Sequence, residues 1–430
     1  MQKKIIALAV AGLVSGVAFA QTSVTLSGIV DAGYNFGKDE TKFDTGAKNT
    51  HKYTNFAGGD SNGASSSRLM INVNEDLGNG LKAGYYQEIG LLHFTGGTNR
   101  ASVTDGINQS TLGAFNRNRQ SFLFLESKQL GKVSIGWTNL INDDNTSNIG
   151  SRNHVGNAYN ASFLKNPTVS ATALPQTSIG QYISVAGTNE GIGAGDISRA
   201  NAISYYSPVF SGFQVMGQYG YAKSSDESDA STGLATKDTD AGYKVWTLGA
   251  KYANGPFNAY AGYQKYSASY DALNATVPTT GTDGDESRRE WIVSAGYDFG
   301  VAKLTGMYFD RKGTASFDST VAATAGSADT TAKYRGGDIG VKVPFGKFSA
   351  FANYGFAKAS YDNDLVGTTG LTAINEAEWK VRTYQLGGQY DLSKRTNVYA
   401  VYGNAKADGD SDAGWDAKRS VFAVGMRHSF

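Results

Sequence analysis

The feature that most constrains the fold is an alternation of apolar and polar side chains along about sixteen segments of the chain. From Trp291 to Phe299 every second side chain is apolar, whereas Ser294, Gly296 and Asp298 occupy the other face. Segments 213–221, 383–390 and 23–34 repeat this pattern. Aromatic residues near both ends of an apolar face are typical of strands that cross a lipid bilayer in a closed sheet.

Two kinds of connection join these segments. The short ones are rich in Gly, Asn, Asp and Pro and predict tight turns at 76–80, 126–132, 207–212, 253–256, 298–301, 344–347 and 392–396. The long ones are polar and lie near 36–66, 95–115, 139–198, 223–242, 267–288, 311–333, 359–378 and 405–418. We therefore predict an all-β fold, a transmembrane antiparallel β-barrel of about 16 strands with short periplasmic turns and long extracellular loops. A soluble exported β domain, such as an adhesin or a sandwich, is the alternative.

Composition and the start of the chain agree with export. Residues 1–20 combine Lys3 and Lys4, an apolar run too short to span a bilayer, and a small-x-small end at Ala18-Phe19-Ala20, so we predict a signal peptide. Residues 21–430 would then form the barrel. The chain has 54 Gly, 25 Tyr and 21 Phe but no Cys, which suits strands and turns without disulfides. Its near-neutral charge argues against a nucleic-acid partner.

Catalytic and metal-binding patterns are not found. The four histidines form no metal-ligand spacing, so we predict no metal and no cofactor. His93 and His154 are the only candidates for a barrel enzyme, and no nucleophile motif accompanies either. We therefore expect no catalytic residues and no enzyme activity.

Several motifs occur in an order that resembles one family. They are 23–31, Ser67-Arg68 followed by 75–83 and Glu88, 201–213, 390–396 and 425–430. Together they resemble the trimeric general diffusion porins of β-proteobacteria, the Gram-negative porin family. The resemblance implies an outer-membrane channel for passive diffusion of small hydrophilic solutes and ions. The alternative within transport is a channel that prefers a sugar or an organic acid.

The resemblance also implies partners. These are outer-membrane lipid and lipopolysaccharide, two further copies in a homotrimer, and the assembly machinery, which would recognise the terminal Phe430. We expect Phe122 and Phe124 on the outer face at the trimer contact. Trp137 stands where the family has an arginine, and it either narrows the lumen, stacks on a sugar, or belongs to packing or an aromatic girdle.

Charged residues on the polar faces suggest where the pore narrows. Asp31, Arg68, Glu88 and Arg119 lie at similar heights on neighbouring strands, and we predict that they line a constriction. The resemblance implies that the third loop, 139–198, folds inward and brings Asp143, Asp144, Glu190 and Asp196 opposite the arginines. Ordinary ion pairs of the wall and a surface loop are the alternatives. Lys82, Lys303 and Lys342 face inward beside short turns, at the predicted periplasmic mouth.

Overall fold

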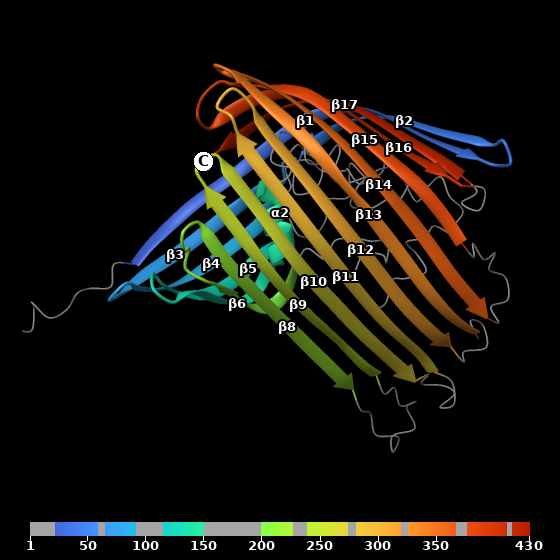
Figure 1. Cartoon of the computed structure of the whole chain (residues 1–430), viewed down its shortest axis with the longest axis horizontal. Helices are drawn as coiled ribbons and strands as arrows, with labels where there is room; N and C mark the ends of the chain where they lie inside the picture. Colours follow the sequence, from blue (N-terminus) through green and yellow to red (C-terminus); the bar gives the residue numbers. More distant parts are fainter. Residues whose placement is uncertain are drawn as a thin grey trace, which may run out of the picture.

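The computed structural model describes residues 22–58, 65–91, 115–149, 199–226, 239–273, 281–319, 326–366, 376–410 and 415–430. Within these ranges, all extended segments belong to one antiparallel sheet that closes on itself (Figure 1). The strands are β1 (Thr22–Phe43), β2 (Lys48–Gly58), β3 (Arg68–Gly78), β4 (Leu81–Leu91), β5 (Phe115–Ser127), β6 (Gly131–Asn139), β7 (Arg199–Tyr206), β8 (Phe213–Asp226), β9 (Thr239–Asn254), β10 (Phe257–Leu273), β11 (Gly281–Asp298), β12 (Lys303–Ser319), β13 (Gly326–Phe345), β14 (Phe348–Val366), β15 (Glu376–Asp391), β16 (Thr396–Gly409) and β17 (Trp415–Ser429). One helix, α2 (Ile141–Ile149), is described between β6 and β7.

The sheet is a closed barrel of sixteen strand positions. β2 and β3 pair with different parts of β1, through Ala32–Lys42 and Thr22–Ile29 respectively, so together they fill one position beside it. β17 pairs with the other edge of β1 and closes the ring. Backbone hydrogen bonds between Gly28 and Phe430 lie at the end of this seam, with N···O distances of 2.9 and 3.1 Å. The predicted strand count and antiparallel order are therefore confirmed.

Side chains alternate between two faces of the wall. The outer face is apolar, and Leu26, Leu123 and Trp291 are each at least half exposed on it. The inner face carries polar residues such as Gln218, Thr247 and Gln385, which are buried. This is the arrangement expected when lipid meets one side of each strand and a lumen the other. Among the described residues, no helix is long and apolar enough to cross a membrane.

All seven predicted short turns are confirmed, because each lies between the end of one strand and the start of the next. Gly78, Gly300 and Gly346 adopt positive φ in three of them, which explains why glycine is needed there. The predicted long loops were too long. β1 continues to Phe43, β10 to Leu273, β12 to Ser319 and β14 to Val366, well inside stretches expected to be loops.

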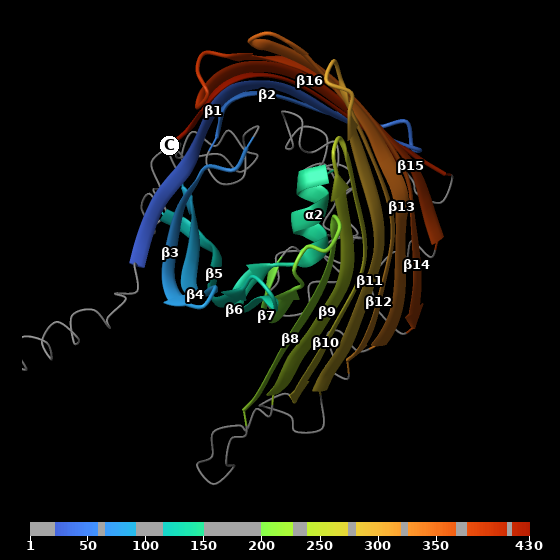
Figure 2. The ribbon, with the colours of Figure 1, turned by 60° about the vertical axis from the view of Figure 1, so that its left-hand side comes forward.

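The helix α2 lies inside the ring of strands (Figure 2). It contacts the inner side of β8 to β12, on the far side from β1 and β3. The first part of the third connection therefore folds into the lumen, as expected. Its remainder, 150–198, lies outside the described residues, and so do Glu190, Asp196, His93, His154 and the predicted signal peptide.

The expected outward position of Phe122 and Phe124 is wrong. Phe124 is buried, and the Lys132 ammonium lies 5.3 Å from the Phe122 ring centroid and 4.4 Å from that of Phe124. Leu123 and Leu125 face outward instead. The reason is a β-bulge: Glu88 pairs with Gln120 and the next residue of β4 pairs with Asn118, so one extra residue of β5 reverses the alternation.

Candidate functional site

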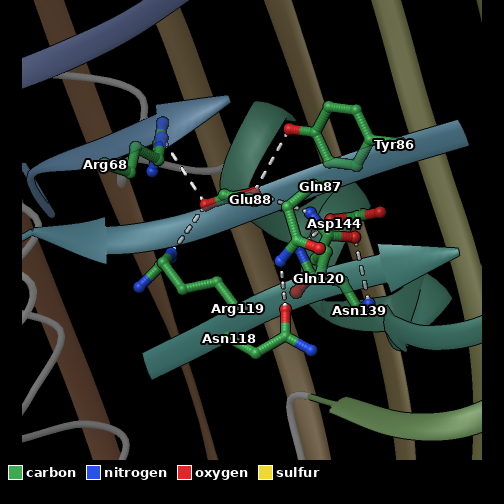
Figure 3. A network of polar contacts seen from close by, with 9 residues as sticks. All are labelled: Arg68, Tyr86, Gln87, Glu88, Asn118, Arg119, Gln120, Asn139 and Asp144. Carbon is green, nitrogen blue, oxygen red and sulfur yellow. Dashed lines mark hydrogen bonds and ion pairs between the residues drawn. The ribbon is translucent and has the colours of Figure 1, made fainter. Parts of the chain in front are cut away.

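Glu88 on β4 contacts two arginines of the inner wall (Figure 3). Arg119 Nε on β5 donates to Glu88 Oε1 at 2.6 Å, and Arg68 Nε on β3 lies 3.6 Å from the same oxygen. The other oxygen, Oε2, accepts from Gln120 at 2.8 Å and from the Tyr86 hydroxyl at 3.3 Å. The bulge explains this coordination, since it turns both Arg119 and Gln120 toward the same carboxylate.

Arg68, Glu88 and Arg119 therefore lie close together, and they form an ion-pair cluster on the inner wall. Glu88 and Arg119 are almost completely buried, whereas the Arg68 side chain is 28% exposed. Charge-assisted hydrogen bonds of this kind are short and hold both partners in fixed positions. Arg68 is the member of the cluster that presents a positive charge to the lumen.

The start of α2 lies next to this cluster. Asn139, the last residue of β6, donates from its side chain to Asp144 Oδ1 at 2.6 Å, and its backbone N–H donates to Gln120 at 3.2 Å. The pKa of Asp144 is raised to about 6, chiefly by burial and also by the charges of Asp143 and Glu88, while the hydrogen bond from Asn139 lowers it. Both aspartates lie in the first helical turn, where the helix dipole favours negative charge.

The other side of α2 is fixed to the opposite wall. Asn142 Nδ2 donates to Glu290 Oε1 of β11 at 2.8 Å, and the Tyr260 hydroxyl of β10 donates to Asn142 Oδ1 at 2.5 Å. Glu290 also forms an ion pair with Arg311 of β12. Ile141 is fully buried beside Met216 and Tyr260. The helix is thus held by polar and apolar contacts that join it to several strands.

The backbone leading into α2 is fixed as well. Gln218 of β8 accepts from the Ile141 N–H at 3.3 Å and donates to the Asn139 carbonyl at 3.1 Å and to Ser204 at 2.9 Å. These contacts lie on the inner face of the wall, between the Glu88 cluster and the Glu290 cluster. Together the three sets of contacts hold α2 against the inner wall.

The remaining predicted residues lie elsewhere. Asp31 is fully buried, and the Tyr399 hydroxyl of β16 donates to it at 2.8 Å across β17, the strand that closes the ring against β1. Lys303 and Lys342 are direct cross-strand neighbours near the short turns, and Lys82 is near the turn after β3. Trp137 shares the outer face with the exposed Ile135, which assigns it to the lipid side of the wall.

Sequence reasoning missed Glu290, Arg311, Tyr260, Asn142 and Gln218. Glu290 has the one usable signal, because it is a charged residue directly before the alternating segment 291–299, at a position whose parity places it on the inner face. Its partner Asn142 lies 148 positions away, and a single sequence carries no trace of that contact. Among the residues that the structure describes, no group of three or more His, Cys, Asp or Glu could hold a metal ion.

A family model described as Gram-negative porin matches residues 7–410. An outer membrane porin protein of Bordetella pertussis is 29% identical, and the alignment covers 100% of both chains. Outer membrane porin protein 32 of Delftia acidovorans is also 29% identical with 100% of both covered. Among solved structures, the anion-selective porin from Comamonas acidovorans is 25% identical, with a TM-score of 0.50 over 95% of this chain and 100% of that one.

Proposed function

The chain belongs to the Gram-negative porin family, and from this premise we propose that α2 and the Glu88 cluster form the constriction of its channel. As an outer-membrane porin, the protein forms a water-filled channel for passive diffusion of small hydrophilic solutes and ions. The proposed narrow point lies between the acidic start of α2 and Arg68. Its wall contains Arg68, Arg119 and Glu88, and its helix contributes Asp143 and Asp144.

One observation carries this proposal: α2 lies inside the barrel, where its Asp144 is hydrogen-bonded to Asn139 of β6 and its Asn142 to Glu290 of β11. A helix held in this way occupies lumen cross-section that a solute would otherwise use. Charged groups at such a position select ions by sign according to which charge is in excess there. Lys82, Lys303 and Lys342 are proposed to line the periplasmic mouth, farther along the same path.

The test is the conductance and ion selectivity of Arg68→Ala and Arg119→Ala channels in planar bilayers. Each change should enlarge the single-channel conductance and move selectivity toward cations, with the larger selectivity change for Arg68, which is the more exposed to the lumen. Arg382→Ala is the matched control, because Arg382 is exposed on the outer face of β15. Wild-type conductance and selectivity in both the Arg68→Ala and the Arg119→Ala channel would contradict the proposal that the constriction lies at this position.

A homotrimer is proposed because one side of the barrel wall is short. β6 has 9 residues and β7 has 8. At about 3.3 Å per residue and a tilt of about 40°, these strands rise only about 20–23 Å, less than the apolar band of about 25 Å. Neighbouring copies would cover this side through outward residues such as Ile135 and Ile203.

The mass of the protein in mild detergent, measured by light scattering, tests the trimer. Ile135→Arg should reduce the mass toward one copy. Ile339→Arg, at a similarly exposed outward position on β13, should leave three copies assembled. A single-copy mass for the unaltered protein would contradict the proposal.

The transport proposed here includes no catalytic step. Phe430 is proposed to be the residue that the outer-membrane assembly machinery recognises, in addition to its bonds with Gly28 in the barrel seam.

A further inference from the structure

Aromatic side chains lie on the inner wall beside the Glu88 cluster, although the inner face of a water-filled barrel is usually polar. Tyr86 of β4 pairs with Phe122 of β5, and their ring centroids are 5.2 Å apart. Phe124 follows two positions later on β5, with its ring centroid 6.4 Å from that of Phe122. We call these three residues the aromatic shelf. Because Tyr86 also donates to Glu88, the shelf lies next to the ion-pair cluster.

Packing within the wall explains only part of the aromatic shelf. Gly84 of β4 lies opposite Phe124, and a Cβ atom there would overlap the Phe124 ring, so glycine allows this ring to lie against the wall. Phe124 is buried, whereas Tyr86 and Phe122 are partly exposed. The bulge in β5 is what turns Phe122 inward, and bulges often direct a side chain toward a functional site. Phe122 therefore presents an apolar ring to the lumen.

A cation lies beside these rings. The Lys132 ammonium of β6 is 4.4 Å from the ring centroid of Phe124 and 5.3 Å from that of Phe122. Among the residues that the structure describes, no carboxylate lies within ion-pair distance of this ammonium. Glu126, its cross-strand neighbour, and Asp144 of α2 act on it only from farther away. An ammonium held by rings retains hydrogen-bond donors for an anionic group.

We propose that the aromatic shelf and Lys132 form a binding site for aromatic carboxylates that pass through the channel. The ring of the solute stacks on Phe122 and Tyr86, and its carboxylate accepts a hydrogen bond from the Lys132 ammonium. One small solute can make both contacts, because the ammonium is 5.3 Å from the Phe122 ring centroid and the carboxylate of benzoate is attached directly to its ring. The inference rests on the proposed water-filled lumen but not on where the channel is narrowest.

Three groups determine which solutes the site prefers. The rings distinguish a flat aromatic solute from a saturated ring of similar size, since only the aromatic ring gains from stacking beyond the area it buries. The Lys132 ammonium distinguishes a carboxylate from a neutral or a positively charged substituent. Asp144 lies near enough to act on both Lys132 and Tyr86, and its negative charge repels an anionic solute. Removal of that charge should therefore strengthen the binding of a carboxylate and weaken that of an aromatic cation.

The test is titration of single open channels in a planar bilayer with benzoate, at constant chloride concentration. The decrease in ion current with benzoate concentration gives its affinity. Cyclohexanecarboxylate has the same charge and a similar size but no aromatic ring, and benzoate should bind about fivefold more tightly than it does. Benzyl alcohol and benzylammonium have the ring without the carboxylate, and both should bind more weakly than benzoate.

Substitutions separate the contribution of the ring from that of the charge. Phe122→Leu should weaken benzoate binding about fivefold and leave cyclohexanecarboxylate nearly unchanged. Lys132→Gln should weaken both carboxylates about fivefold, and Asp144→Asn should strengthen both. Phe351→Leu is the matched control for the ring, because Phe351 lies on the inner face of β14 but is 3% exposed. Lys128→Gln is the control for the charge, because Lys128 is exposed in the turn after β5. Both controls should bind benzoate as the unaltered channel does.

Equal affinity for benzoate and cyclohexanecarboxylate would overturn the proposal. So would unchanged benzoate affinity in Phe122→Leu or in Lys132→Gln, or an equal loss in the control variants. The current in salt alone, recorded before any solute is added, shows whether each variant forms a channel. A channel that conducts ions but does not bind benzoate overturns only the binding site, whereas a membrane without current contradicts the proposed channel itself.

Discussion

Glu88→Gln should change the ion selectivity of the channel without changing its shape. The amide has the same size as the carboxylate and still accepts a hydrogen bond from Arg119, now 2.6 Å away. The substitution removes one negative charge from beside Arg68 and Arg119. The lumen should therefore attract anions more strongly and cations less strongly.

The size of the effect follows from Coulomb's law. An ion that passes about 6 Å from Glu88, in surroundings with a dielectric constant of about 80, changes in energy by about 0.7 kcal/mol when the charge is removed. Because the change has opposite signs for a cation and an anion, the anion-to-cation permeability ratio should rise by about tenfold. Salt screens the effect, so it should decrease strongly between 0.1 M and 1 M.

The assay is the reversal potential of single channels in a planar bilayer with a salt gradient. Glu378→Gln is the matched control, because Glu378 is paired with Lys358 on the outer face of the wall. It should leave the reversal potential unchanged. A Glu88→Gln channel with the same reversal potential as the control would refute the placement of Glu88 at the narrow point.

Four further changes test other parts of the structure. Glu290→Gln should weaken the attachment of α2 and increase current noise, with only a small change in mean conductance, in single-channel recordings. Because the pKa of Asp144 is raised to about 6, this carboxyl is neutral well below pH 6 and charged well above it. The preference of the channel for cations should therefore rise with pH through this value. Asp144→Asn should abolish the corresponding step in reversal potential between pH 5 and 7. Deleting Phe430 should lower the yield of assembled barrel in outer-membrane fractions, and Gly28→Leu should do so more mildly, because its side chain would meet the Phe430 ring.

Much of the fold could be predicted from local signals. Alternation identified the wall segments, because one face of each strand must suit lipid, and Gly at turn positions identified the short connections. Strand length was harder to predict. The segment from Arg311 to Ser319 is polar, which predicts a loop, yet it continues β12, because a strand above the lipid no longer needs an apolar outer face.

The candidate site was predictable only in part. Arg68, Glu88 and Arg119 were found because they lie on adjacent strands at one height, which sequence spacing can show. The bulge at Glu88 was not visible, and it is the reason that Phe122 and Phe124 were assigned to the wrong face. The contact from Asn142 to Glu290 was equally hidden, because it depends on how a loop returns to a wall formed much later in the chain.

The unequal strand lengths have a consequence for how solutes reach the pore. β13 has 20 residues and β14 has 19, which at about 3.3 Å per residue and a tilt of about 40° gives a height of about 50 Å. The hydrocarbon layer is only about 30 Å thick. On this side the barrel wall therefore extends beyond the lipid into the sugar layer of the cell surface. The outer opening of the channel then lies among surface glycans rather than at the lipid.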